Sequence, residues 1–293
     1  MLFRSINKME RENARLWLRE YVARIGSQNK AAKALGVSAA TLSNIENEKW
    51  DLLNTDMIRK IAAAVRPTSG AGWQVVQTHA LKEIFYVMND ARMYCNIHWV
   101  VGESGCGKTT AATHYAQTNP NVFYILCSED MRKSDFVRGV ASSMGLSHDG
   151  LSVRETLALV TRTMVTLENP LLIIDEGDKP LDNVFHYYIN LYNLLEDKCG
   201  FVFLSTPYIK RRISSGLRIG KKGYKEIDSR IGRKFAELDH TTARDVEIVC
   251  RGNGVTNPKE IDKVVRETQD YFFDFRAVKK KVHYLNRIRT ATP

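Results

Sequence analysis

The sequence predicts an α/β fold with a parallel sheet covered by helices on both faces, an all-α unit before it and another after it. Four apolar runs are expected as strands, at residues 96–101, 122–127, 171–175 and 201–205. Helical patterns lie before and between them, at 78–93, 108–117, 134–144, 152–167 and 183–197. Such alternation is typical of parallel sheets, because each parallel pair of strands needs a long crossover connection.

Composition bounds the class of protein. With 293 residues, 44% of them hydrophobic and 26% charged, the chain is long enough for one large domain and smaller ones. No apolar run approaches the roughly 20 residues of a membrane span, and residues 1–24 lack a signal-peptide core. The five cysteines are scattered without a C-x-x-C pair, which predicts reduced thiols in the cytoplasm.

The run from Gly102 to Thr109 fits the phosphate-loop template G-x-x-x-x-G-K-[ST] and follows the first expected strand. Its glycines let successive backbone N–H groups point at phosphate oxygens at the start of a helix. Lys108 is expected to neutralise the β- and γ-phosphates, and Thr109 to bind Mg²⁺. The simpler alternative is a glycine turn before a helix. The expected ATP-binding residues here are Gly102, Glu103, Ser104, Gly105, Cys106, Gly107, Lys108, Thr109 and Thr110.

A second nucleotide motif ends the third expected strand, where apolar residues are followed by Asp175 and Glu176. Asp175 is expected to hold Mg²⁺, directly or through water, and Glu176 to polarise the attacking water as catalytic base. The structural alternative for Glu176 is an acid at a helix N-terminus. Two acids at a strand end are common, so the combination with the phosphate loop is what predicts ATP hydrolysis.

Residues 29–50 predict a helix-turn-helix, with a turn at Gly36 and a second helix capped by Ser38. Val37, Leu42 and Ile45 are expected to pack the second helix onto the first. The residues expected on the exposed recognition face, in contact with DNA, are Ser38, Ala39, Ala40, Thr41, Ser43 and Asn44. The alternative is a helical bundle that contacts protein. Residues 67–72, rich in Pro, Ser and Gly, form the expected linker.

The net charge of +10 favours a polyanionic partner. Between Lys210 and Lys234 there are ten basic residues and two acids, and a second basic cluster follows Asp274. The basic residues expected to contact the DNA backbone are Arg132, Lys133, Lys210, Arg211, Arg212, Lys221 and Lys222. Most charge runs are solvated faces, and this is the alternative here.

Taken in order, the helix-turn-helix, the linker, the two nucleotide motifs and Ser229-Arg230-Ile231 resemble the AAA+ transposition ATPases, the family of the target-selecting B proteins of phage Mu and its prophage relatives. The helix at 77–91 and Phe275-Arg276 extend the resemblance over most of the chain. It implies a helix-turn-helix domain at 1–66, the linker at 67–72, an AAA+ α/β domain at 73–240 and a helical lid at 241–293.

The resemblance also implies roles for residues outside the two motifs. Thr206, after the fourth strand, would sense the γ-phosphate, with Ser205 as the alternative. Arg230 would act as an arginine finger on the neighbouring subunit's nucleotide, where it stabilises charge on the transferred phosphoryl group, with Arg233 as a substitute. Arg276 would be the lid arginine that approaches the nucleotide.

In function, the resemblance implies ATP- and Mg²⁺-dependent assembly of a filament on double-stranded DNA, with little sequence preference. The filament would select the target DNA and stimulate a partner DDE transposase in a bacterial or phage-infected cell, and hydrolysis would dismantle it. Two alternatives stay open. One is a helicase loader or initiator-type AAA+ protein, and the other is a transcription regulator whose helix-turn-helix is switched by nucleotide.

Overall fold

The computed structural model describes residues 8–65 and 73–291, and the chain divides into two compact units between Trp73 and Gln74. We call them the N-terminal unit and the C-terminal unit. The linker predicted at 67–72 lies outside the described residues. None of the helices in the described ranges is long and apolar enough to cross a membrane.

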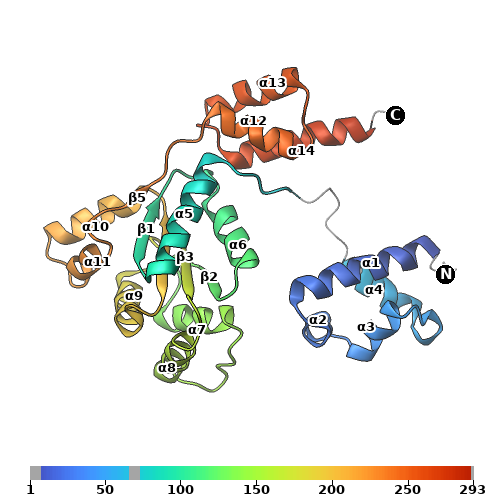
Figure 1. The fold of residues 1–293 in the computed structure, drawn as a ribbon, viewed down its shortest axis with the longest axis horizontal. Coiled ribbons are helices and arrows are strands. Elements are labelled where there is room, and N and C mark those ends of the chain that lie inside the picture. Colours follow the sequence, from blue (N-terminus) through green and yellow to red (C-terminus); the bar gives the residue numbers. More distant parts are fainter. Residues whose placement is uncertain (1–7, 66–72, 292–293) are drawn as a thin grey trace. The chain divides into compact units, whose positions relative to one another are not determined.

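The N-terminal unit is helical throughout its described part (Figure 1). Its elements are α1 (Lys8–Ile25), α2 (Gln28–Leu35), α3 (Ala39–Glu46), the 3₁₀ turn η1 (Trp50–Leu52) and α4 (Thr55–Val65). Gly36 ends α2 at φ +64°, a conformation that favours glycine, and the hydroxyl of Ser38 caps α3 by accepting the amide of Thr41 at 3.1 Å. Leu42 and Ile45 are fully buried, which confirms the predicted packing of α3.

The C-terminal unit is built on a parallel sheet with the strand order β2-β3-β4-β1-β5. The strands are β1 (Ile97–Val101), β2 (Val122–Leu126), β3 (Leu171–Asp175), β4 (Gly200–Ser205) and β5 (Ala236–Glu237). The first four were predicted. β5 was not predicted, because only two residues pair there and no apolar run marks them. Since β3, β4 and β1 are neighbours, the segments that follow them meet at the carboxyl edge of the sheet.

Helices cover both faces of this sheet (Figure 1). One face carries α5 (His79–Tyr94) and α6 (Lys108–Thr118), and the other carries α7 (Lys133–Ser143), α8 (Val153–Met164) and α9 (Asp182–Leu195). Alternate residues of β3 enter the two cores, Leu171 and Ile173 on the α5 side and Leu172 and Ile174 on the α7 side. Burial on both faces explains why the strands read as continuous apolar runs.

Five more helices complete the unit. After β4 come α10 (Tyr208–Arg218) and α11 (Tyr224–Arg230), and after β5 come α12 (Ala243–Gly252), α13 (Pro258–Gln269) and α14 (Phe275–Ala291). The last three lie within the helical unit expected at 241–293, and Pro258 opens the second of them. Asn257 caps α13 by accepting the amide of Lys259 at 3.0 Å. The helices α10 and α11 were not predicted, because their residues stand out in the sequence only as a basic segment.

Candidate nucleotide site

The phosphate loop connects the end of β1 at Val101 to the start of α6 at Lys108. Gly105 and Gly107 have φ angles of +80° and +100°, which residues other than glycine rarely adopt. Lys108 is 9% exposed, and its ammonium donates to the carbonyls of Gly102 at 2.7 Å and Glu103 at 2.9 Å. The loop therefore wraps around one cation at the N-terminus of a helix, an arrangement that binds anions.

The other predicted loop residues differ in exposure. Glu103, Ser104, Thr109 and Thr110 are exposed, whereas Cys106 is buried with its sulfur 3.8 Å from the Lys108 ammonium. Burial raises the pKa of the Cys106 thiol, which Lys108 lowers only in part. A thiol held in this way is a small packing residue beneath the loop.

Asp175 joins the two nucleotide motifs. Its Oδ2 accepts the Thr109 hydroxyl at 2.7 Å and the Tyr124 hydroxyl at 3.0 Å, and its Oδ1 accepts the Glu176 amide at 3.0 Å. A hydroxyl and a carboxylate side by side are the oxygen donors that Mg²⁺ takes, so Thr109 and Asp175 fit this ion. Burial first, and then the Asp175 charge, raise the pKa of Tyr124 far above its usual value, so this phenol stays a donor.

Glu176 follows Asp175 in a left-handed backbone conformation, with φ +54°. Its side chain is 25% exposed, and its Oε2 lies 3.6 Å from the Lys179 ammonium. The side chain is therefore partly open to solvent. Glu176 is thus placed where a base must meet water, beside the Asp175 carboxylate.

Thr206 follows β4 and donates its hydroxyl to Oδ2 of Asp178 at 3.1 Å. Asp178 is 6% exposed, and its Oδ1 has no hydrogen-bond partner among the described residues. The alternative sensor, Ser205, is 1% exposed, and its hydroxyl accepts the Trp99 indole N–H at 2.8 Å. The structure therefore places Thr206 at the site and Ser205 in the core.

The sequence analysis missed Tyr124 and Asp178. Asp178 comes two residues after Glu176, which was a usable signal, because a third acid close to the expected Mg²⁺ ligand and the expected base is expensive to bury without a role. Tyr124 gave no signal, because an aromatic residue within a strand is ordinary.

The start of α14 contacts the phosphate loop. The Phe275 amide donates to the Gly105 carbonyl at 3.0 Å, and Nη1 of Arg276 donates to the Ser104 hydroxyl at 3.0 Å. A side chain at Gly105 would collide with the Asp274 carboxylate. Arg276 therefore lies beside the loop, where the sequence analysis expected it.

Arg230 lies elsewhere. Its Nε and Nη2 donate to Oδ1 of Asn193 at 3.1 and 3.0 Å, and its guanidinium lies 5.8 Å from the Tyr192 ring. Asn193 is near the end of α9, and Ile97, the first residue of β1, lines the same hollow. Both mark the amino edge of the sheet, opposite the phosphate loop. The structure thus separates Arg230 from its own chain's loop, and the exposed Arg233 follows it at φ +58°.

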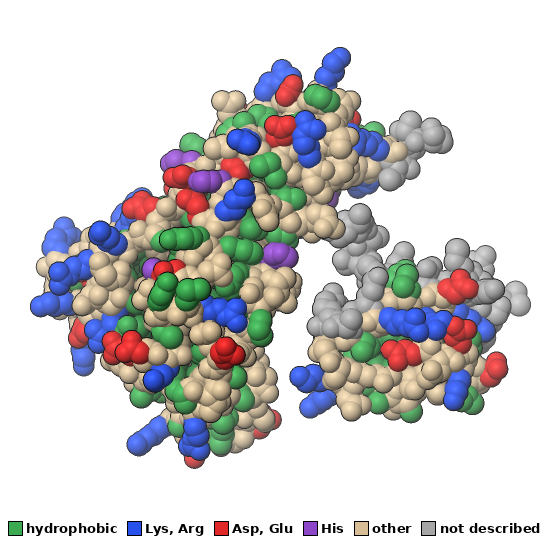
Figure 2. Space-filling model, in the orientation of Figure 1, with side chains coloured by type: hydrophobic (Ala, Val, Ile, Leu, Met, Phe, Trp, Pro, Cys, Tyr) green, Lys and Arg blue, Asp and Glu red, His purple; other side chains and the backbone are tan. Residues whose placement is uncertain are grey.

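Lys and Arg side chains gather over α10 and α11 (Figure 2). Two predicted DNA contacts there are engaged by Asp182: Nη2 of Arg212 lies 2.8 Å from its Oδ1, and Lys221 pairs with its Oδ2. The Tyr224 hydroxyl also donates to Oδ1 of Asp182, at 2.6 Å. Burial alone would raise the pKa of Asp182, but these donors hold it well below its usual range.

The remaining predicted DNA contacts of this unit differ from one another. Lys210 pairs with Glu237 at 2.5 Å, while Arg132, Lys133, Arg211 and Lys222 are exposed. Three of these seven predicted basic contacts therefore have an intramolecular acid as partner. The basic run predicted surface charge correctly but could not separate structural from available cations.

In the N-terminal unit, the predicted recognition face is partly occupied by local bonds. The Ser38 and Thr41 hydroxyls lie 2.8 Å apart, and the Ser43 hydroxyl accepts Nδ2 of Asn47 at 3.2 Å. Ser38 is exposed, and Ala39 and Asn44 are half-buried. These bonds orient the hydroxyls along α3, and each hydroxyl keeps further capacity to donate or accept a hydrogen bond.

The fold and this site are those of an ATPase with a phosphate loop. Residues 91–213 match the protein family described as AAA domain, and ATPase activity follows from that domain. The resemblance to the transposition ATPases is confirmed by curated relatives.

The chain is 23% identical over 249 residues to the Mu-like prophage FluMu DNA transposition protein B of Haemophilus influenzae, covering 82% of this chain and 84% of the relative. It is 24% identical to the ATP-dependent target DNA activator B of Escherichia phage Mu, covering 78% of this chain and 73% of that one. Among solved structures, a chain of Drosophila ORC bound to DNA matches at 14% identity and a TM-score of 0.46, over 77% of this chain and 59% of that chain.

Proposed function

We propose that this protein assembles as an ATP-dependent filament on double-stranded DNA, marks that DNA as a transposition target and stimulates a DDE transposase. Hydrolysis of ATP then dismantles the filament. The relatives named as a transposition protein and as a target DNA activator support this choice of process.

The position of Arg230 carries the assembly part of the proposal. Lys108, Thr109 and Asp175 meet at the carboxyl edge, whereas Arg230 lies against Asn193 at the amino edge of the same sheet. Because Arg230 and the phosphate loop lie at opposite edges of the sheet, Arg230 can serve a phosphoryl group only on another subunit. ATP would then bridge two copies, and the γ-phosphate would control their association.

The exposed cations support backbone-directed DNA binding. Arg211 and Lys222 on the surface of the α10–α11 region, and Arg132 and Lys133 at the start of α7, are available for phosphates. Contacts of this kind give affinity with little sequence preference and a steep dependence on salt.

Electron microscopy with Mg²⁺, ATP and duplex DNA of mixed sequence tests the proposal. We expect continuous filaments with ATP and none with the Lys108→Ala variant. Isolated rings or sparse particles would contradict the filament and favour the initiator or helicase-loader alternative. A protected, sequence-specific footprint without filaments would favour the transcription regulator.

Disassembly is tested with Glu176→Gln, which keeps the shape of the side chain and removes the base. We expect kcat to fall by about 10²-fold or more, with filaments that persist after ATP is added. Glu129→Gln, a change at an exposed acid after β2, is the control and keeps wild-type turnover. Normal hydrolysis by Glu176→Gln would reject Glu176 as the base. Strand transfer by the partner transposase into filament-coated DNA then measures target marking.

A further inference from the structure

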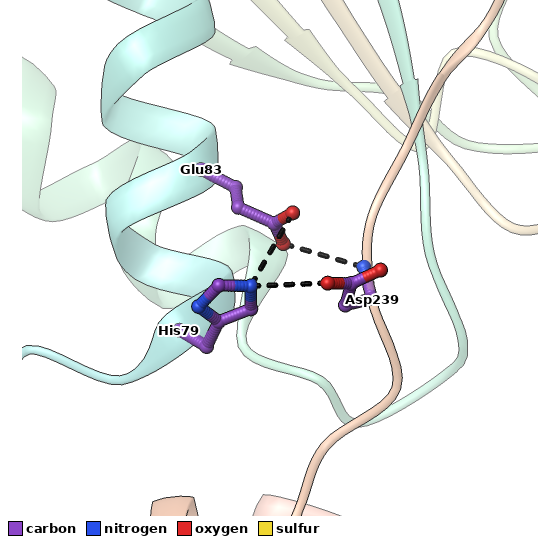
Figure 3. Close-up of side chains that lie close together, drawn as sticks. All are labelled: His79, Glu83 and Asp239. Carbon is purple, nitrogen blue, oxygen red and sulfur yellow. Dashed lines mark hydrogen bonds and ion pairs between the residues drawn. The ribbon is translucent and has the colours of Figure 1, made fainter.

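Three potential metal ligands lie together outside the nucleotide site. His79 and Glu83 are one turn apart on α5, and Asp239 belongs to the segment that connects β5 to α12 (Figure 3). One ligand atom from each lies within 4.8 Å of the other two. The side chains of His79 and Asp239 are 56% and 75% exposed, so an ion from solvent can reach them.

Two carboxylates converge on the same ring nitrogen. Nε2 of His79 lies 3.1 Å from Oδ2 of Asp239 and 3.7 Å from Oε1 of Glu83. The second distance is too long for a hydrogen bond, so the imidazole cannot serve both acids as a donor. A metal ion at 2.0–2.2 Å from nitrogen and oxygen ligands in a tetrahedron sets those ligands roughly 3.3 Å apart, between the two observed distances.

Backbone amides of the cluster donate to the side chains of Glu83 and Asp245. The other oxygen of Glu83, Oε2, accepts the Asp239 amide at 3.3 Å, and the His79 amide donates to Oδ1 of Asp245 at 2.8 Å. Asp245 is 4% exposed in the first turn of α12. The acids Glu83, Asp239 and Asp245 thus gather around His79, and a divalent cation bound there would offset the repulsion between them.

We propose that His79, Glu83 and Asp239 form a binding site for a divalent transition-metal ion of the Zn²⁺ type. One nitrogen and two carboxylate oxygens suit Zn²⁺ better than Mg²⁺, which prefers oxygen alone and retains its waters. The three protein ligands leave a coordination position for water.

The bound ion would link α5 to the segment that connects the sheet to the last three helices. Leu238, next to Asp239, packs so closely on Gly102 of the phosphate loop that a side chain there would lie 2.8 Å from it. A metal that fixes Asp239 against α5 therefore fixes the connection between the phosphate loop and α12. Its binding would slow movement of α12–α14 relative to the loop.

Calorimetric titration of the chain with Zn²⁺ tests the site. Because thiol reductants and nucleotide phosphates bind zinc themselves, the buffer contains a phosphine reductant and no nucleotide. The protein carries Cys95→Ser, because Cys95 is the one cysteine that is not buried. We expect one ion per chain, and at least tenfold weaker binding for His79→Ala, Asp239→Ala and Glu83→Gln. The control is His148→Ala, which removes a histidine that contacts Ser142 and keeps affinity within about twofold.

Two further readouts keep the test decisive. Thermal melting of each variant without metal shows whether it is folded, and Glu83→Gln keeps an acceptor for the Asp239 amide. Amide hydrogen exchange should slow at residues 238–245 when Zn²⁺ is added to the Cys95→Ser protein, and should not change in His79→Ala. Unaltered zinc affinity in all three variants, or protection elsewhere only, would overturn the proposal.

Discussion

The carboxyl edge of the sheet and the α10–α11 region both carry many charges, but they use them differently. At the edge, Lys108 and Asp175 are nearly buried and each has two or more hydrogen-bond partners from neighbouring segments. On α10 and α11, Arg212 is held by Asp182, whereas the adjacent Arg211 is exposed. Position in a fixed motif thus determines the role of a charge, while membership of a basic run does not.

Arg230 gives the sharpest contrast, because it belongs to the basic region but is proposed to serve the nucleotide site of another copy. We expect Arg230→Ala to lower the DNA-stimulated kcat by about 10³-fold, since it removes a cation from the transition state. Binding of nucleotide by the isolated chain should stay as in the wild type. The assays are steady-state ATPase and fluorescent-ATP titration.

Two variants control this prediction. Lys225→Ala removes an exposed cation from the same helix and should leave kcat unchanged. If Arg233→Ala abolishes hydrolysis while Arg230→Ala does not, Arg233 is the finger. A loss of nucleotide binding in monomeric Arg230→Ala would instead indicate a role within its own chain.

Lys108 tests the carboxyl edge itself. Lys108→Ala should weaken ATP binding by about 10²-fold or more, because the ammonium is the phosphate loop's own buried cation. The measurement is fluorescent-ATP titration, with Lys82→Ala on the exposed side of α5 as the control. Unchanged affinity would mean that nucleotide does not bind at this loop.

Asp178 tests whether a buried acid at the edge positions its neighbour. Asp178→Asn should lower kcat, by up to about 10²-fold, with little change in KM, because Thr206 loses the charged acceptor that orients it. Thr206→Val should produce a loss of similar size, and the double variant no further loss, since both act through one contact. Additive losses would show that the two residues act independently.

Neighbouring arginines separate structure from DNA binding on α10. Arg212→Ala should reduce the free energy of unfolding by about 1–3 kcal/mol, because Asp182 loses a partner that is 14% exposed. The Asp182 pKa is lowered in the folded state, so this stabilisation is complete above its usual range and is lost as pH falls through the lowered pKa. Denaturant melts at neutral and acid pH measure it.

Arg211→Ala should give the smallest effect and the opposite pattern. Stability should stay within experimental error, while the slope of log affinity for DNA against log salt concentration should fall by about 0.9. The pair Lys222→Ala and Lys221→Ala repeats this comparison between α10 and α11, because Lys222 is exposed and Lys221 pairs with Asp182. Equal loss of DNA affinity in Arg211→Ala and Arg212→Ala would show that the Asp182 pair opens when DNA binds.

Much of the fold could be predicted from the sequence where strands are buried on both faces of the sheet. β3 was predicted with its observed bounds, because a strand covered on both faces is a continuous apolar run that ends where the acids begin. β5 escaped prediction, because two residues beside β1 carry no pattern of their own. The start of α13 is marked in the sequence by Asn257 and Pro258, whose local chemistry favours a helix N-terminus.

In the candidate site, too, residues within a local motif were predicted, whereas contacts between distant segments were not. Its motif residues were predicted because the loop geometry demands glycine, lysine and threonine at fixed spacing. The partnership of Thr206 with Asp178 was not predicted, because it joins segments after two different strands and depends on their order in the sheet. The capture of Arg212 and Lys221 by Asp182 was missed for the same reason.

Glu176 holds a backbone conformation that glycine would accept without strain, at φ +54°. Such a residue costs the folded state about 1 kcal/mol or more. Glycine at this position would therefore be expected to raise the melting temperature while removing the carboxylate, so heat resistance and turnover would change in opposite directions. A selection for thermal tolerance alone, without a demand for hydrolysis, would tend to lose the base that the proposed cycle requires.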